Sequence, residues 1–171
     1  MEGERGGSGR QPVKRFSHID TAGAARMVDV SAKPALCRRA VARGEIRLRP
    51  ATLAALEKQR MAKGNVFAAA RLAGIMAAKK TGDLIPLCHP LSLTHCAVDF
   101  EIPAGRDRVI ITASAAITAP TGVEMEALTA VSVAALAIYD MCKAADRSMR
   151  ITGIQLVSKT KTAPPCKSSP A

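Results

Sequence analysis

The sequence predicts an α+β fold in which helices pack on one face of an antiparallel sheet. Two observations predict it. First, short segments with strand-like alternation are separated by longer apolar segments with helical spacing. Second, aromatic residues make up 2% of the chain and hydrophobic residues 48%, so the core must consist of Ala, Val, Ile, Leu and Met. Such a core favours helices packed closely on a sheet.

The first half of the chain supplies strands and a pair of helices. Residues 26–30 and 40–48 alternate as strands do. Pro50 stands at the first turn of a helix that ends at Gly64, and residues 66–80 form a second helix. Apolar residues follow Pro50 within the first helix, namely Leu53, Leu56 and Met61.

A loop and a hairpin come next. Residues 84–93 contain two prolines and must be irregular, so Cys88 and His89 are expected on a loop, where functional sites concentrate. Residues 96–102 and 109–116 are predicted strands, joined by a short turn that contains Pro and Gly.

The last helix and strand complete the order of elements. Thr121 is predicted to cap a helix that extends to Lys143, with Glu124 completing a capping box. Residues 151–158 form the final strand. The resulting order, β-α-β-β-α-β with the helix pair as one helical connection, is that of ferredoxin-like folds.

Both ends of the chain are expected to be disordered. Residues 1–15 contain four glycines and little that is apolar, and residues 161–171 contain three prolines. One folded domain, residues 16–160, lies between them. It is large enough to bury a core without disulfides or metals.

The chain is strongly basic, with 25 Lys and Arg against 14 Asp and Glu and a net charge of +11. This balance indicates a nucleic-acid partner or a strongly anionic small molecule. Because proteins that hold single strands usually stack bases on aromatic rings, the scarcity of rings favours the small molecule. A nucleic-acid binder remains an alternative on charge alone.

Five cysteines are scattered singly along the chain, with no C-x-x-C pair and an odd total. They predict neither a disulfide framework nor a structural zinc site, and no metal is expected. A reducing, cytoplasmic location is the natural interpretation. No apolar segment approaches the length of a membrane span, so no membrane association is expected.

Two carboxylates near opposite ends of the last helix present a geometric problem. Glu126 and Asp140 fall within about 40° of one helix face but about 21 Å apart along an ideal helix. No small substrate touches both. Either they have unrelated tasks, or the helix is kinked, or a partner subunit brings its Glu126 to this chain's Asp140. Asp140 and Lys143 are true neighbours, and such a pair can tune a lysine for proton transfer.

Each of these polar residues also has an ordinary structural interpretation. Glu124 would be a helix cap, and Asp140 with Lys143 a surface ion pair of small energetic value. His89 would be a loop histidine, and Lys63 a surface lysine beside a helix end. Taken singly, none of them supports a functional claim.

Six segments together resemble one family. They occur in the order and spacing of the MoaC family of molybdenum cofactor biosynthesis, and the resemblance covers about residues 16–160. The most specific of them are residues 84–90 and 121–129. The full set is 27–33, 63–67, 73–79, 84–90, 121–129 and 139–143.

The resemblance implies a lyase whose substrate is (8S)-3′,8-cyclo-7,8-dihydroguanosine 5′-triphosphate. The product would be cyclic pyranopterin monophosphate, with diphosphate released and no metal or organic cofactor used. The resemblance also implies a homo-oligomer, a hexamer built as a trimer of dimers with sites at subunit interfaces. A triphosphate would explain the basic balance, because Lys and Arg are the side chains that hold phosphate.

The resemblance also implies residue roles. Asp140 matches the family's catalytic aspartate, and Lys63 and Lys143 match lysines that act as acid and base. The residues that match substrate-binding positions are Asp29, Lys33, Arg38, Leu87, Cys88, His89, Glu124, Met125, Glu126 and Lys159.

The tail departs from the family. After Thr160 the family usually continues with a glycine pair and a short Lys-Ser-Gly segment, whereas residues 161–166 here contain two prolines. Glycines would let a loop close over phosphate, and prolines cannot. A catalytically impaired homologue with a binding or structural role is therefore the alternative. Asn65, where many members have Asp, is a milder change.

Overall fold

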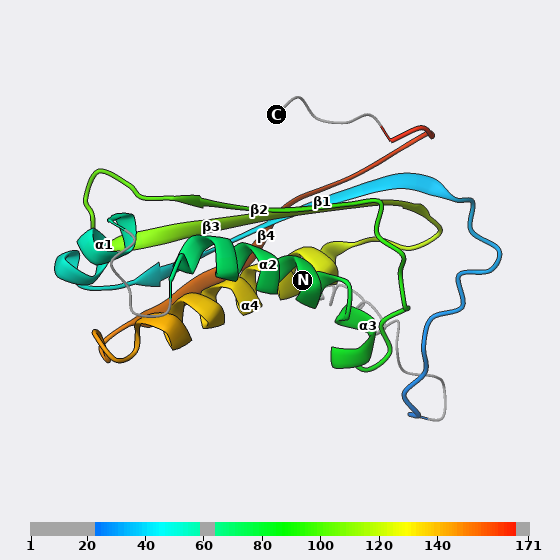
Figure 1. The fold of residues 1–171 in the computed structure, drawn as a ribbon. Helices are drawn as coiled ribbons and strands as arrows, with labels where there is room; N and C mark the ends of the chain where they lie inside the picture. Colours follow the sequence, from blue (N-terminus) through cyan, green and yellow to red (C-terminus); the bar gives the residue numbers. More distant parts are fainter. Residues whose placement is uncertain (1–22, 59–63, 167–171) are drawn as a thin grey trace, which may run out of the picture.

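The computed structural model describes residues 23–58 and 64–166, which form a four-stranded sheet with two long helices, α2 and α4, on one of its faces (Figure 1). The strands are β1 (Leu36–Arg47), β2 (His95–Glu101), β3 (Arg108–Ala119) and β4 (Arg150–Thr162). The helices are α1 (Pro50–Glu57), α2 (Val66–Ala78), α3 (Thr81–Leu84) and α4 (Glu124–Cys142).

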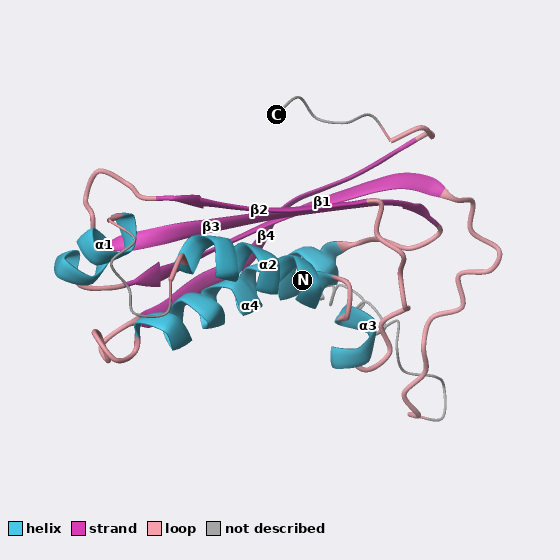
Figure 2. Cartoon of the chain, in the orientation of Figure 1, coloured by secondary structure: helices cyan, strands magenta, loops and turns pink. Residues whose placement is uncertain are grey.

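The strand order is β2-β3-β1-β4, and each neighbouring pair is antiparallel. Helices α1 to α3 connect β1 to β2, and β3 lies between these two strands in the sheet (Figure 2). Helix α4 connects β3 to β4, and β1 lies between those two. This is the split β-α-β-β-α-β arrangement, so the predicted ferredoxin-like fold is confirmed. It leaves β4 as an edge strand that pairs only with β1.

The core lies between the sheet and helices α2 and α4 and consists of small aliphatic side chains. Two glycines mark the closest approaches. A Cβ on Gly44 of β1 would lie 2.8 Å from Val131 Cγ1, and one on Gly74 of α2 would lie 2.8 Å from the carbonyl oxygen of Ala130. Real Cβ atoms do not come so close, so both positions depend on glycine. This is the close helix-on-sheet packing that the low aromatic content predicts.

Helix α4 is long and apolar enough to cross a membrane by length and composition alone, but half of its apolar window is buried inside the chain. Its buried residues recur at helical spacing, which is the pattern of a core helix. They include Ala127, Ala130, Val131, Ala134 and Ile138.

Most of the predicted elements are confirmed with boundaries shifted by a few residues. The strand predicted at 40–48 is β1, which begins earlier, at Leu36. The strands predicted at 96–102 and 109–116 are β2 and β3, and the helix predicted at 66–80 is α2.

Helix α1 begins at Pro50, as predicted. Its predicted continuation through Met61, and Lys63 beyond it, lie outside the described residues, as does the segment 1–15. The short helix α3 was not predicted. It follows α2 directly, and Thr81 begins it by donating its hydroxyl hydrogen to the carbonyl oxygen of Ala78.

The predicted strand at residues 26–30 is wrong. The segment is irregular, because both edges of β1 are already occupied by β3 and β4 and leave no inner place for it. Its alternation has another cause. Val28 and Val30 line a cavity, while the Asp29 side chain between them accepts a hydrogen bond from the backbone N–H of Ser31 at 2.9 Å.

The predicted capping box at the start of α4 is also wrong. The N-cap residue is Val123, no side chain caps the helix, and Thr121 lies before it. The Glu124 carboxylate, which the capping box requires, instead forms an ion pair with Lys159 of β4. A strong electrostatic partner from a distant strand therefore replaces the local hydrogen bond.

The end of the chain differs from the prediction in two ways. Strand β4 continues to Thr162, four residues beyond the predicted end at Ser158. The expectation that no cysteines pair is wrong, because Cys37 and Cys166 form a disulfide. They are 129 residues apart in sequence, and only the pairing of β1 with β4 brings them together, so their spacing could not reveal it.

Candidate active site

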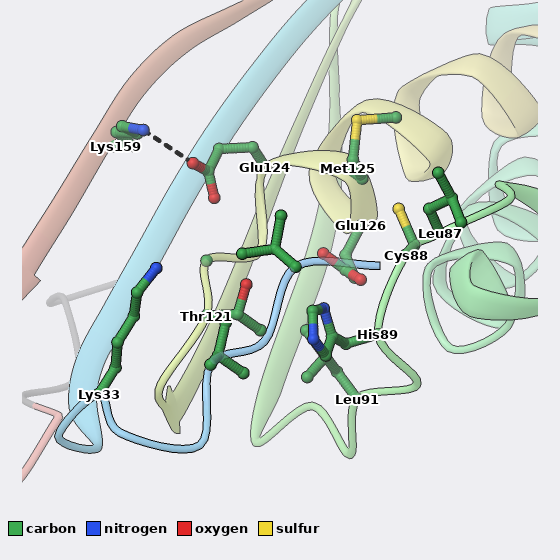
Figure 3. Close-up of a pocket in the computed structure, with 13 residues that line it drawn as sticks. Lys33, Leu87, Cys88, His89, Leu91, Thr121, Glu124, Met125, Glu126 and Lys159 are labelled. Atoms are coloured by element: carbon green, nitrogen blue, oxygen red, sulfur yellow. Dashed lines mark hydrogen bonds and ion pairs between the residues drawn. The ribbon is translucent and has the colours of Figure 1, made fainter. Parts of the chain in front are cut away.

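A cavity of about 520 Å³ opens beside the N-terminal turn of α4. The helix, the loop after α3, the segment before β1 and strand β4 all contribute to its wall (Figure 3). It is lined by Val28, Val30, Lys33, Leu87, Cys88, His89, Leu91, Thr121, Gly122, Glu124, Met125, Glu126 and Lys159.

One side of this cavity holds a buried carboxyl. Glu126 is 3% exposed, and burial raises its pKa, with the charge of Glu124 adding to the rise. Figure 3 shows its carboxylate close to Cys88 and His89. A carboxyl with a raised pKa holds its proton to higher pH than an ordinary glutamate, which suits proton transfer.

Cys88 is a poor candidate for a nucleophile. Burial raises the pKa of its thiol, and the negative charge of Glu126 raises it further. A thiol, unlike a thiolate, is a weak nucleophile. Cys88 therefore fits a contact surface for a ligand, together with the apolar side chains of Leu87 and Met125.

The other side of the cavity is basic. A second cavity of about 260 Å³ shares Gly122, Glu124 and Lys159 with the first. Its remaining lining residues are mostly cationic: Arg38, Arg39, Thr160 and Lys161. The two cavities together offer an uncharged surface next to a cluster of cations, which suits a ligand that has a ring and an anionic tail.

Arg38 is held in place by backbone acceptors. Its Nε donates to the carbonyl oxygen of Ala119 at 3.0 Å, and its other guanidinium nitrogen donates to that of Pro120 at 2.9 Å. Both acceptors belong to the end of β3 and the turn after it. The guanidinium is therefore preorganised and does not lose side-chain freedom when an anion binds.

Glu124 connects the two cavities. Burial would raise its pKa, but the hydrogen bond from Lys159, a backbone hydrogen bond and the charges of Lys159 and Arg38 together hold the pKa below its ordinary value. A Cβ on Gly122 would meet the Glu124 carboxylate oxygen at 1.9 Å. Glycine at this position therefore allows the carboxylate to fold back toward β4.

Eight of the ten predicted substrate-binding residues line the first cavity: Lys33, Leu87, Cys88, His89, Glu124, Met125, Glu126 and Lys159. Arg38 lines the second. Asp29 lines neither cavity, although both of its neighbours line the first. The other lining residues were not predicted, because nothing in the residue pattern distinguishes them as ligand contacts: Val28, Val30, Arg39, Leu91, Thr121, Gly122, Thr160 and Lys161.

The structure does not bring two of the predicted catalytic residues, Asp140 and Lys143, to these cavities, and the third, Lys63, lies outside the described residues. Lys143 Nζ lies 2.7 Å from Asp140 Oδ1, and both side chains are 57% exposed at the far end of α4. The hydrogen bond that Lys143 donates to Asp140 raises the pKa of Lys143, which favours its protonated form. Helix α4 is continuous from Glu124 to Cys142, which places Glu126 and Asp140 about 21 Å apart along the helix.

Within residues 23–58 and 64–166, no group of three or more His, Cys, Asp or Glu side chains could hold a metal ion. The donor types in the cavities are instead carboxylates facing ammonium and guanidinium groups. They suit proton transfer and anion binding.

Comparisons with known proteins agree with the arrangement of residues. The MoaC family model matches residues 27–162. A protein of Roseiflexus sp. (strain RS-1) named cyclic pyranopterin monophosphate synthase is 60% identical over 145 residues, covering 85% of this chain and 92% of that protein. Proteins with the same name from Rhodospirillum rubrum and Chloroflexus aggregans are 58% and 54% identical, covering 85% and 86% of this chain and 87% and 89% of their own.

Proposed function

Because the chain belongs to the MoaC family, we propose that it is a cyclic pyranopterin monophosphate synthase, a lyase of molybdenum cofactor biosynthesis. Its reaction converts (8S)-3′,8-cyclo-7,8-dihydroguanosine 5′-triphosphate to cyclic pyranopterin monophosphate and diphosphate. The observation that carries this proposal for the site is the pair of adjoining cavities, one with a buried carboxyl and one lined by cations.

The purine-derived ring is placed in the first cavity. Leu87, Cys88 and Met125 offer apolar contact surface there, and His89 and Glu126 offer hydrogen-bonding groups. The raised pKa of Glu126 supports a role in holding the ring through a proton that it donates or accepts.

The triphosphate is placed in the second cavity and at its border. Lys159 lines both cavities, Lys33 lines the first, and the preorganised Arg38 lines the second. Loss of diphosphate requires a substrate oxygen to form a bond to the first (α) phosphorus. The bond from that phosphorus to the oxygen that bridges to the second phosphate then breaks, and diphosphate leaves. Cations around the leaving diphosphate stabilise the charge that develops on it.

The Asp140–Lys143 pair is assigned to a site completed by a partner subunit. The separation of about 21 Å along α4 excludes a substrate that touches both ends of one helix. A two-fold related chain would place its own Asp140 and Lys143 beside this chain's cavities. We assign Lys143 the role of proton donor, since Asp140 favours its charged form, and Lys63 the complementary role.

This assignment implies a homo-oligomer, which we propose to be a hexamer formed as a trimer of dimers, acting in the cytoplasm on a small molecule. Neither a nucleic acid nor a membrane is part of the proposed function. In this proposal, phosphate binding accounts for the net charge of +11. Retention on duplex DNA or RNA at low salt, lost steeply as salt rises, would favour the nucleic-acid alternative.

The test is an assay of the purified chain with the cyclic triphosphate, in which pterin product and diphosphate are measured together. Wild-type protein should form both in equal amounts. Asp140→Ala and Lys63→Ala should each lower kcat at least about a hundredfold, the usual range for loss of a proton-transfer group. Unchanged turnover in either variant would overturn the assigned roles.

The second candidate function is a homologue that binds the substrate without converting it. The specific observation in its favour is the tail. The Cys37–Cys166 disulfide joins the tail to β1, and two prolines stand where the family usually has glycines. A chain in which residues 161–166 are replaced by a glycine-rich segment decides the question. Comparable turnover by the two chains would exclude the impaired homologue, and activity only after replacement would establish it.

A further inference from the structure

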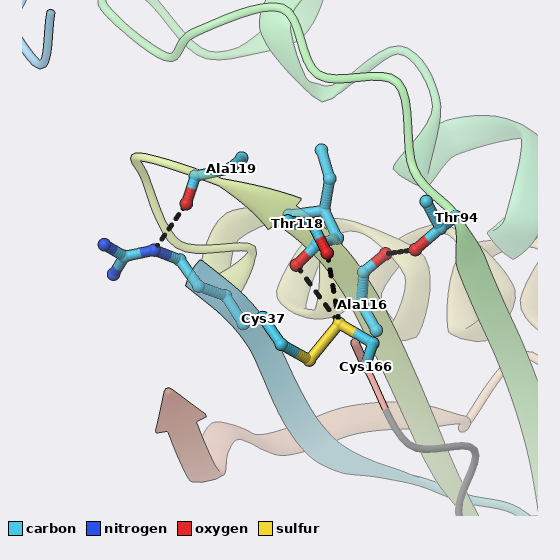
Figure 4. Close-up of a disulfide and its surroundings, with 8 residues drawn as sticks. Cys37, Thr94, Ala116, Thr118, Ala119 and Cys166 are labelled. Atoms are coloured by element: carbon cyan, nitrogen blue, oxygen red, sulfur yellow. Dashed lines mark hydrogen bonds between the residues drawn. A yellow bond between two sulfur atoms is a disulfide. The ribbon is translucent and has the colours of Figure 1, made fainter. Parts of the chain in front are cut away.

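The Cys37–Cys166 disulfide fastens the end of the edge strand β4 to the inner strand β1. Thr162, the last residue of β4, pairs with Cys37, and the chain then turns back so that Cys166 reaches Cys37 (Figure 4). Cys166 Sγ also lies 3.6 Å from Thr118 Oγ1 of β3. The tail therefore crosses β1 and touches β3.

This fastening lies directly beside the basic cavity. Arg38 follows Cys37 in sequence, and Lys161 is the residue of β4 that pairs with Arg38. Lys159, Thr160 and Lys161 supply the β4 side of the cavity. The disulfide thus fastens the strand end that carries three of the seven lining residues.

Besides the disulfide, the strand end is held by its pairing with residues 37–41 of β1 and by the Lys159–Glu124 ion pair. The register between β1 and β4 shifts twice, between Val41 and Ala42 and between Arg43 and Glu45, just before this last paired stretch. Most of β4 is exposed, and it has a neighbour on one edge only. Ends of edge strands of this kind open at low free-energy cost.

We propose that Cys37 and Cys166 are a reversible thiol–disulfide modification site that switches the basic cavity between an ordered, anion-binding form and a loosened form. The anion is an oligophosphate, and its identity as the substrate's triphosphate rests on the proposed function. In the oxidised chain, the disulfide holds Lys161 opposite Arg38 and Lys159 opposite Ala40. In the reduced chain, residues 159–166 separate from β1 more often and the anion must order them on binding.

The exchange step needs a dithiol as reductant. A thiolate of the dithiol attacks Cys166 Sγ, the bond between Cys166 and Cys37 breaks, and the Cys37 sulfur leaves as a thiolate and takes up a proton. The second thiol of the reductant then attacks its own mixed disulfide and releases Cys166 as a thiol. Two electrons and two protons pass to the chain, and the dithiol becomes a cyclic disulfide. A small-molecule disulfide reverses the step.

Among the five cysteines, exposure and thiol pKa favour thiol–disulfide exchange at Cys37 and Cys166. Cys166 is half-buried and can be reached, whereas Cys37 is 7% exposed and serves as the leaving sulfur. Cys142 is buried in the core. Burial raises the pKa values of Cys88 and Cys96, so they form little of the thiolate that exchange requires.

The experiment measures binding of inorganic tripolyphosphate to the full chain by titration calorimetry, with the protein oxidised or kept reduced by excess dithiol. Reduction should weaken binding roughly tenfold, the equivalent of ordering about one backbone residue. Cys166→Ser should bind as the reduced chain does under both conditions. Cys96→Ser is the matched control and should keep the full response to reduction.

Trypsin supplies a second readout that needs no ligand. Cleavage after Lys159 and Lys161 should be faster in the reduced chain and in Cys166→Ser, and slow in the oxidised chain. Equal affinity and equal cleavage in both redox states would overturn the proposal, as would five alkylatable thiols in the air-oxidised protein. Redox-dependent binding without turnover of the cyclic triphosphate would retain the switch and reject the enzyme. Turnover with redox-independent binding would do the reverse.

Discussion

Lys159 Nζ lies 2.9 Å from Glu124 Oε1 and joins the edge strand β4 to the first turn of the core helix α4. The Lys159 side chain is 67% exposed and Glu124 is 29% exposed, so the pair stands at the border of the two cavities. The carboxylate neutralises the lysine while no anion is bound. An incoming phosphate must compete with Glu124 for Lys159, so the pair should favour binding of strongly charged anions over weakly charged ones.

Replacing Lys159 by Gln should weaken binding of inorganic tripolyphosphate about tenfold, because a hydrogen bond to a charged group is lost. Unfolding free energy should change by less than about 1 kcal/mol, since the ion pair is largely exposed. Calorimetry and urea unfolding measure the two quantities. Lys58→Gln, at the exposed end of α1, is the control, and equal losses of affinity in both variants would show that only general charge matters.

Asp146 should make the free energy of unfolding fall at acidic pH. Its buried carboxylate accepts hydrogen bonds from the backbone N–H groups of Arg49 at 2.8 Å and Ser148 at 2.9 Å. Burial alone would raise its pKa, but these bonds and the Arg49 charge hold the pKa far below its ordinary value. A depressed folded-state pKa gives stability that is present above the unfolded pKa of about 4 and is lost as pH falls below it.

Asp146→Asn should therefore lower the free energy of unfolding by about 2–4 kcal/mol at neutral pH, and the difference from wild type should shrink below about pH 4. Urea unfolding at several pH values measures this. Asp83→Asn, on an exposed residue of α3, should follow wild type at each pH. A difference for Asp146→Asn that stays constant with pH would exclude a role for the charged form.

Glu126→Gln should have the opposite pH dependence. Burial raises the folded-state pKa of Glu126, so its contribution to stability is complete below the unfolded pKa and declines as pH rises through the folded pKa. Relative to wild type, the melting temperature of the variant should rise as pH increases above about 4, the unfolded-state pKa of a glutamate. Glu101→Gln at an exposed end of β2 is the control, and a parallel rise in that variant would refute the prediction.

Mixing two inactive variants tests the composite site. Asp140→Ala removes one end of α4, and His89→Ala alters the cavity at the other. If each site takes its cavity from one chain and Asp140 from another, random pairing makes about half of the dimers mixed, with one of two sites intact. Activity should then recover to about 25% of wild type after the variants are refolded together. Mixtures as inactive as their components would place all site residues on one chain.

Gly74→Ala should destabilise the chain although alanine favours helices. The added Cβ would meet the carbonyl oxygen of Ala130 at 2.8 Å and Val98 Cγ2 at 3.2 Å. Overpacking costs about 1–3 kcal/mol and exceeds the helix-propensity gain of about 1 kcal/mol. Thermal unfolding measures the net loss. Gly105→Ala, whose Cβ would meet only Asp107 Oδ1 at 3.6 Å, should be neutral, and equal melting temperatures for both variants would contradict the packing account.

The sequence predicts the fold because helical spacing and apolar runs report burial: α2 and α4 each bury one face, and the inner strand β3 is buried over consecutive residues such as Val109, Ile110 and Ile111. The same rule fails at residues 26–30. Val28 and Val30 alternate there because they line a cavity, and periodicity alone does not distinguish a cavity wall from a sheet.

The missed features of the site depend on contacts between distant parts of the chain. Glu124 pairs with Lys159, 35 residues away, and Cys37 pairs with Cys166. Both contacts exist only after β4 has aligned with β1, which no local pattern describes. Asp140 lies far from Glu126 along α4, so its proposed role would require contact with a second chain, which no sequence pattern describes.

The strand order has a consequence for biosynthesis of the protein. Strand β1 is made early but keeps an open edge until β4, which begins at Arg150, has left the ribosome. Until then the nascent chain exposes a row of unpaired backbone groups that can join a second copy. The cation-lined cavity cannot exist on a ribosome-bound fragment that ends before β4, so ligand capture begins only after nearly the whole domain has been translated.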